Sequence, residues 1–143
     1  MNNVVNEIRN WHLFTEKFGT EYEMHDAVIK RFDLNEDDLT IVVNTLYKIV
    51  NDKVYDITFK FYKLIRFDYD AEIGNDYING IEVKKDKYYK NLFSFTFNSV
   101  CLTIECFTIE LLSIKESEPY QRGMIWLNDP DQTGENDTMM WRT

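Results

Sequence analysis

The spacing of apolar residues along this chain changes from a helical to a strand-like period after residue 26. Over residues 3–18 the apolar positions recur every three or four residues, which is typical of the buried face of an amphipathic helix. This apolar set is Val4, Ile8, Trp11, Phe14 and Phe18. Gly19 follows at the position of a C-terminal cap, so the pattern predicts one helix over residues 3–18.

Alternation with a period of two dominates the next part of the chain. Residues 27–33 and 39–50 are predicted strands, and the acidic residues 35–38 form the turn between them. The clearest alternation predicts a long antiparallel strand over residues 54–67, with one face buried and one face in water. Its apolar face, continued to residue 69, is Tyr55, Ile57, Phe59, Phe61, Ile65, Phe67 and Tyr69. Lys63 interrupts this face and predicts a bulge or bend there.

Three further strand-like runs follow an acidic loop at residues 71–77. The first covers residues 78–85, and the second contains Phe93, Phe95 and Phe97. The last run changes phase, because its apolar residues occupy even positions up to Cys106 and odd positions from Phe107 onward. Such a phase slip predicts a β-bulge, because one inserted residue exchanges the two faces of a strand.

One helical segment followed by about six alternating strands predicts the fold class. We expect an α+β domain in which the N-terminal helix packs on an antiparallel, strongly curved sheet, half-barrel or sandwich. This domain is expected to cover residues 1–115 of the 143-residue chain. Residues 116–143, which hold six acidic and two basic residues, are expected to form a partly ordered acidic C-terminal tail.

The charge balance restricts the classes of partner. Sixteen basic and 25 acidic residues give a net charge of −9, which disfavours nucleic acid and anionic membranes and favours a basic protein partner. Cys101 and Cys106 are expected to be reduced thiols in the core, which suits a cytoplasmic location. The sequence shows neither a signal peptide nor a run of about 20 apolar residues that could cross a membrane.

No group of residues in the sequence has the pattern of a catalytic or metal centre. His25 and Asp26 are adjacent, but His12 is the only other histidine, so a three-histidine zinc site is impossible. Two acidic loops, at residues 68–79 and 129–140, lack the glutamate that completes a calcium loop. We therefore expect no enzyme activity, no metal and no cofactor. His25 is expected to order the helix-to-strand junction near Trp11, and Asp26 to cap backbone amides.

A short motif carries a family resemblance. Trp11 on the helix, Phe18-Gly19 at its end and Met24-His25-Asp26-Ala27 before the first strand resemble the bacterial immunity protein 50 family. The similarity extends over about residues 7–114 and includes Ile109-Glu110. It implies a small cytoplasmic protein, encoded beside a polymorphic toxin, that binds the toxin and blocks it by occlusion. The alternative is a non-catalytic intracellular protein-interaction module with a different partner.

The segment from residue 68 to residue 77 is the candidate binding surface. It combines acidic and aromatic side chains without lysine or arginine, which suits a basic patch on a partner. The candidate residues are Asp68, Tyr69, Asp70, Glu72, Asp76 and Tyr77. The alternative is that these residues form an ordinary solvated turn.

Overall fold

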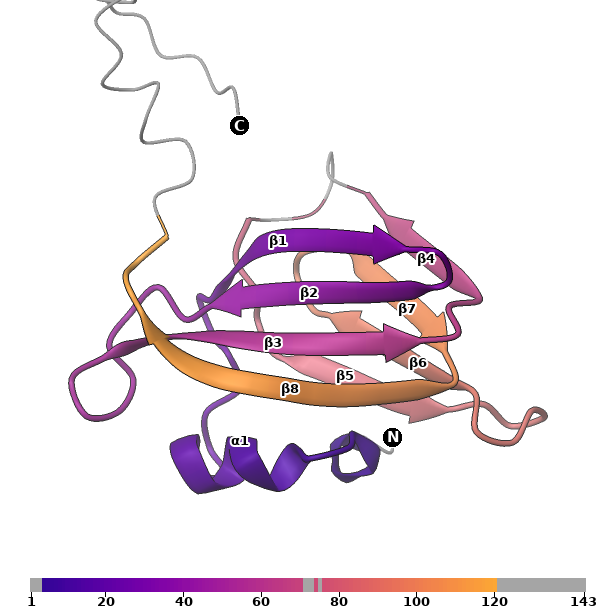
Figure 1. The fold of residues 1–143 in the computed structure, drawn as a ribbon, viewed down its shortest axis with the longest axis horizontal. Coiled ribbons are helices and arrows are strands. Elements are labelled where there is room, and N and C mark those ends of the chain that lie inside the picture. The colour runs from indigo at the N-terminus through magenta and orange to yellow at the C-terminus, as the bar shows by residue number, and fades with distance from the viewer. Residues whose placement is uncertain (1–3, 71–73, 75, 121–143) are drawn as a thin grey trace, which may run out of the picture.

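The computed structural model describes residues 4–70, 74 and 76–120, which form a sandwich of two antiparallel sheets (Figure 1). One sheet has the strand order β1-β2-β3-β8, and the other has the order β4-β7-β6-β5. The strands are β1 (Val28–Asn35), β2 (Asp38–Asn44), β3 (Val54–Tyr62), β4 (Arg66–Tyr69), β5 (Ile81–Lys85), β6 (Phe93–Phe97), β7 (Leu102–Cys106) and β8 (Thr108–Ser117). A short N-terminal helix accompanies them, so the α+β prediction is confirmed, with eight strands in place of about six.

The two sheets enclose a core in which phenylalanine rings from both layers meet. Phe59 and Phe61 of β3 contact Phe95 of β6 at ring-centroid distances of 5.6 and 5.0 Å. Phe95 in turn contacts Phe97 at 4.9 Å in an edge-to-face arrangement. All four side chains are fully buried, and tilted ring pairs of this kind stabilise a core beyond the burial of apolar area alone. The alternating phenylalanines of β6 are therefore core residues, as their spacing predicts.

The chain crosses between the two sheets at the two places where the sequence pattern is interrupted. Lys63 has a φ angle of 58°, and it separates β3 of one sheet from β4 of the other. The predicted bend is confirmed, whereas the predicted single strand over residues 54–67 is wrong. The phase slip after Cys106 is the second crossing, because Phe107 separates β7 from β8. A change of sheet exchanges the faces as a bulge does, and this accounts for the wrong interpretation.

The predicted helix over residues 3–18 is broken in its middle. A 3₁₀ turn covers Val5–Glu7, and helix α1 covers Trp11–Phe18. Between them the backbone of Arg9 pairs with β8: its N–H donates to Ile109 at 2.8 Å, and its carbonyl accepts from Leu111 at 2.9 Å. Helical backbone cannot make these bonds, so pairing with a distant strand overrides the local helical pattern.

The N-terminal segment closes one edge of the sandwich instead of lying on a sheet face. Its residue Val4 donates a backbone hydrogen bond to Val83 of β5 at 2.8 Å, while Arg9 pairs with β8. Figure 1 shows α1 along the edge formed by β8 and β5. Trp11 and Phe14 of the helix stack on each other at 4.3 Å, and both are buried in the core cluster. Gly19 ends the helix with a φ angle of 82°. The predicted cap at Gly19 is confirmed.

A buried asparagine holds the end of β8 and the residues that follow it. The Asn44 side chain donates to the Asp56 carboxylate at 2.8 Å and to the Glu118 carbonyl at 3.0 Å. Its oxygen accepts from the backbone N–H groups of Leu46 and Tyr120. The segment that was expected to be a tail from residue 116 therefore starts inside β8 and is attached to the sheet as far as Tyr120. Residues 121–143 lie outside the described part.

The two cysteines occupy different environments. Cys106 is fully buried, whereas Cys101 is exposed in the turn before β7 with a φ angle of 62°. The prediction that both are core thiols is therefore wrong for Cys101, because the strand starts one residue after it. No helix in the described residues is long and apolar enough to cross a membrane.

Candidate partner-binding surface

Within the described part of the chain, no segment covers the sandwich edge formed by β1 and β4 as the N-terminal segment covers the opposite edge. Both strands are outer strands, β1 of one sheet and β4 of the other. In Figure 1 they lie one in front of the other at the edge farthest from α1. Tyr77 forms a bridge with Val28, the first residue of β1, and Ile78 pairs with Ala27 just before the strand. No other described residue pairs with the outer side of β1.

The inner face of β1 is exposed at this edge. Phe32 pairs with Ile41 and Leu34 pairs with Leu39 across the antiparallel ladder. Side chains of paired residues point to the same face of a sheet, and both partners in β2 are fully buried in the core. Phe32 and Leu34 therefore point inward, yet they remain 37% and 61% exposed. The opposite sheet does not reach far enough sideways to cover them.

Strand β4 repeats this arrangement in the second sheet. Phe67 pairs with Ile104 and Tyr69 pairs with Leu102, and both partners are fully buried. Phe67 and Tyr69 are nevertheless 38% and 45% exposed. The prediction that these two rings belong to the buried face of a long strand is right for their direction and wrong for their burial. Ile65, from the same predicted face, is exposed as well.

Aromatic contacts join the two exposed inner faces. The ring of Phe32 lies 5.9 Å from Phe67 and 5.9 Å from Tyr69, measured between centroids. Together with Leu34, these residues form one apolar surface that spans both sheets, which we call the open-edge patch. Isolated exposed apolar residues are common, whereas contiguous patches with a polar surround mark interaction sites.

Charged residues surround the open-edge patch with an excess of negative charge. Arg31 pairs with Asp33 at 3.4 Å, and Arg66 pairs with Asp68 at 3.4 Å, so each arginine has a carboxylate next to it. Further exposed acids lie in the β1–β2 turn and after β4. These are Glu36, Asp37, Asp70 and Asp76. The polar surround of the patch is therefore acidic.

The candidate residues predicted from the sequence lie at one end of this patch. Asp68 and Tyr69 belong to β4, and the backbone N–H of Asp70 donates to the Cys101 carbonyl at 3.0 Å. Glu72 lies outside the described residues. Asp76 and Tyr77 are exposed, and Tyr77 pairs with Val28 at the start of β1. The two ends of the segment therefore lie at β4 and at the start of β1, the two outer strands of the open edge.

The sequence does not identify the apolar centre of the surface. Phe32, Leu34 and Phe67 alternate with polar residues just as core residues do, and they do point toward the core. Alternation distinguishes the two faces of a strand, but it carries no information on how far the opposite sheet extends. The only sequence signal for this surface is the acidic and aromatic composition of the predicted segment.

The His25 and Asp26 pair lies at an exposed corner just before β1, beside Ile78 and Asn79. The His25 Nδ1 atom is 2.9 Å from the Asn79 side-chain oxygen, and its Nε2 atom is 3.6 Å from the Asp26 carboxylate. The expected capping of amides by the Asp26 side chain is absent among the described residues. The Asp26 backbone makes the connection instead, donating to Ile78 at 2.9 Å from a left-handed conformation with φ of 66°.

Comparisons with known proteins assign no family. No family model matches this chain, and neither a curated protein nor a solved structure matches it. Within the described residues, no three histidine, cysteine or carboxylate side chains are placed to hold a metal ion together. The class that the geometry defines is an α+β sandwich with one covered and one open edge.

Proposed function

We propose that this protein is a cytoplasmic, non-catalytic immunity protein that binds a basic toxin domain through the open-edge patch and blocks it by occlusion. The observation that supports this function best is the patch itself, where inward-facing apolar side chains are left exposed on both sheets. Its acidic surround is complementary to a basic surface. The Met24-His25-Asp26-Ala27 motif adds the resemblance to the immunity protein 50 family.

Occlusion requires binding energy and a large contact surface but no reactive groups. Interfaces concentrate their energy in aromatic anchors that are surrounded by polar residues. Phe32, Phe67 and Tyr69 supply such anchors in mutual contact, so little side-chain freedom remains to be lost on binding. The acidic residues around them would accelerate association with a basic partner.

The family resemblance implies a toxin gene next to this one, and that toxin provides the direct test. Expression of that toxin in a host cell should stop growth, and co-expression of this protein should restore it. The double variant Phe32→Ala/Tyr69→Ala should bind at least about 30-fold more weakly, since the loss of even one anchor costs about 2 kcal/mol or more. The matched control is Tyr88→Ala/Tyr89→Ala, which removes two exposed rings from the β5–β6 turn.

Each part of the proposal can fail separately. If the wild-type protein gives no protection, the immunity function is wrong, and an interaction module with another partner is the alternative. If protection is retained equally by both double variants, the open-edge patch is the wrong surface. Unchanged melting temperatures of the variants would show that any loss of binding does not come from unfolding.

The acidic surround has its own kinetic test. Reversal of Asp70, Glu72 and Asp76 to lysine should slow association with the toxin and reduce the dependence of the association rate on salt. The dissociation rate should change less, because charges outside the apolar contact act mainly on the association rate. An unchanged association rate and salt dependence would show that the segment is a solvated turn without a role in binding.

A further inference from the structure

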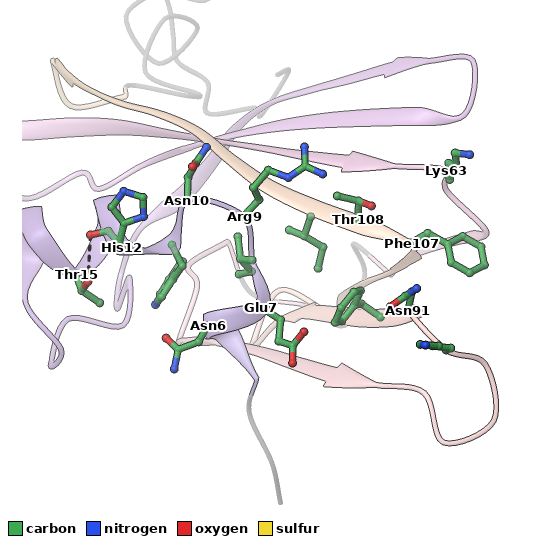
Figure 2. A pocket seen from close by; sticks show the side chains of 15 residues that line it. Asn6, Glu7, Arg9, Asn10, His12, Thr15, Lys63, Asn91, Phe107 and Thr108 are labelled. Carbon is green, nitrogen blue, oxygen red and sulfur yellow. Dashed lines mark hydrogen bonds between the residues drawn. The ribbon is translucent and has the colours of Figure 1, made fainter.

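A groove of about 990 Å³ lies beside the N-terminal segment, at the covered edge of the sandwich (Figure 2). Its walls come from residues 6–15, from the end of the β5–β6 turn at residues 90–93, and from the start of β8 at residues 107–109. Lys63, at the first crossing between the sheets, completes it. The groove is separate from the open-edge patch, because the patch residues Phe32, Leu34, Phe67 and Tyr69 do not line it.

The groove gathers positive charge on an acidic protein. Its lining includes Arg9, Lys63 and Lys90 but a single carboxylate, Glu7. That carboxylate is already paired with Lys85 at 3.4 Å. The chain as a whole has a net charge of −9. A concave surface lined by three cations therefore has the opposite charge to the protein as a whole.

Two of these three cations, Lys63 and Lys90, also have no charged partner among the described residues. Most lysines and arginines in the described part of the chain make an ion pair or lie over an aromatic ring. The lysines there that do neither are Lys63, Lys87, Lys90 and Lys115. Two of the four line this groove, although acidic residues outnumber basic ones. Unpaired cations in a concave surface concentrate anions there.

The backbone fixes the positions from which these side chains extend. Arg9 is held by its two backbone bonds to β8, and its side chain is 60% exposed, with the Glu110 carboxylate 3.9 Å from the guanidinium. Figure 2 shows the Arg9 side chain extended along the groove in the direction of Lys63. The backbone N–H of Lys63 donates to the Asp38 carboxylate at 3.3 Å. A cation on a fixed backbone loses less freedom when it binds an anion.

Neutral groups in the groove complement the cations. The side chains of Asn91 and Thr108 line it and make no hydrogen bond to another described residue. Trp11 and Phe93, which are almost fully buried, present apolar edges to it. The volume of the groove lies in the range of small-molecule sites, about 300–1,000 Å³, and its lining is mostly polar.

We propose that this groove binds a small phosphorylated molecule with a flat apolar part, the chemical class of the nucleoside phosphates. Three cations match the two or more negative charges of a phosphate group better than the single charge of a carboxylate. Arginine donates in a planar fork that fits phosphate oxygens, and lysine adds point charges. Asn91 and Thr108 provide neutral donors, and Trp11, Phe93 and Phe107 provide the apolar contact. The proposal is independent of the proposed function.

Titration of the full chain with ADP tests this site. At physiological salt, isothermal titration calorimetry should show saturable binding of one ADP per chain, and inorganic phosphate should bind more weakly. In ¹H–¹⁵N spectra, ADP should shift the signals of the Trp11 indole and the Asn91 amides. The double variant Lys63→Gln/Lys90→Gln should bind ADP at least tenfold more weakly.

The other two unpaired lysines provide a matched control. The variant Lys87→Gln/Lys115→Gln removes the same charge outside the groove and should keep the affinity of the wild type. Equal loss in both double variants would overturn the proposal, because it would mean non-specific attraction. Absence of saturable ADP binding would also overturn it, as would binding of a single-stranded oligonucleotide without binding of ADP. All four lysines are exposed, so the variants should fold.

Discussion

Replacement of Asn44 tests how the structure attaches the C-terminal end of β8 to the sandwich. Asn44 has no exposed surface, and its side-chain amide makes two donor and two acceptor hydrogen bonds. These bonds join the strand end to Asp56 of β3 and to the backbone of Glu118 and Tyr120. The substitution Asn44→Ala deletes all four bonds and leaves their partners without a replacement from the protein.

The expected loss of stability depends on whether the four former partners of the Asn44 side chain can bind water instead. A hydrogen bond contributes about 1 kcal/mol net, so four bonds set an upper value of about 4 kcal/mol. The backbone groups of Glu118 and Tyr120 lie near the surface and can bind water after the substitution, so about 2 kcal/mol is the lower value. A domain of this size loses about 4 °C in melting temperature per kcal/mol, so we expect a fall of about 8–16 °C.

Thermal and urea unfolding of the full chain measure this loss. The control is Asn35→Ala, because Asn35 is exposed in β1 and makes no side-chain hydrogen bond to another described residue. Its melting temperature should stay within about 2 °C of the wild type, since surface substitutions typically change stability by less than about 0.5 kcal/mol. If Asn44→Ala were as stable as this control, the four bonds would not hold β8 and the segment after it.

Four further predictions concern single side chains. Tyr22→Phe should leave stability unchanged or raise it by up to about 1 kcal/mol, because the Tyr22 hydroxyl is buried without a partner in the described part; a clear loss in urea unfolding would contradict this. In the native protein at pH 8 a thiol reagent should label Cys101 alone, because burial raises the pKa of Cys106 to about 12; two rapid labels per chain would refute it. Trp11→Ala should cost about 3–5 kcal/mol, which an unchanged melting temperature would disprove. Gly74→Ala should lower the melting temperature, because an added Cβ would lie 2.1 Å from the Val100 carbonyl oxygen, and a variant as stable as the wild type would exclude that contact.

The strands of the core could be predicted because their pattern is local. Phe93, Phe95 and Phe97 alternate within five residues, and all three are buried in β6 as expected. The break in the N-terminal helix could not be predicted in this way. It depends on backbone pairing of Arg9 with residues around Glu110, about one hundred positions away in the sequence. The apolar pattern of residues 3–18 carries no information about a contact with a strand so far along the chain. The pattern therefore predicts a continuous helix.

The candidate surface also has one part that the sequence predicts and one part that it does not. The acidic and aromatic character of residues 68–77 is visible in the sequence, because it depends on composition alone. The apolar centre depends on the relative width of two sheets. Phe32 and Ile41 have equivalent patterns and point to the same side of one sheet, yet Ile41 is fully buried and Phe32 is 37% exposed. Only the assembled sandwich distinguishes them, since the difference is set by the opposite layer.

The exposure of an apolar strand edge raises the question of what opposes pairing between copies of this protein there. Unpaired edge strands join readily unless charges oppose the contact. Two copies meeting at this edge would bring their acidic residues together, including Glu36 and Asp37 of the β1–β2 turn and Asp70 after β4. That repulsion disfavours self-association, whereas a basic partner would convert the same charges into attraction. Under the proposed function, the acidic surround would have two effects: it would oppose contact between copies at the open-edge patch, and it would attract a basic partner to Phe32, Phe67 and Tyr69.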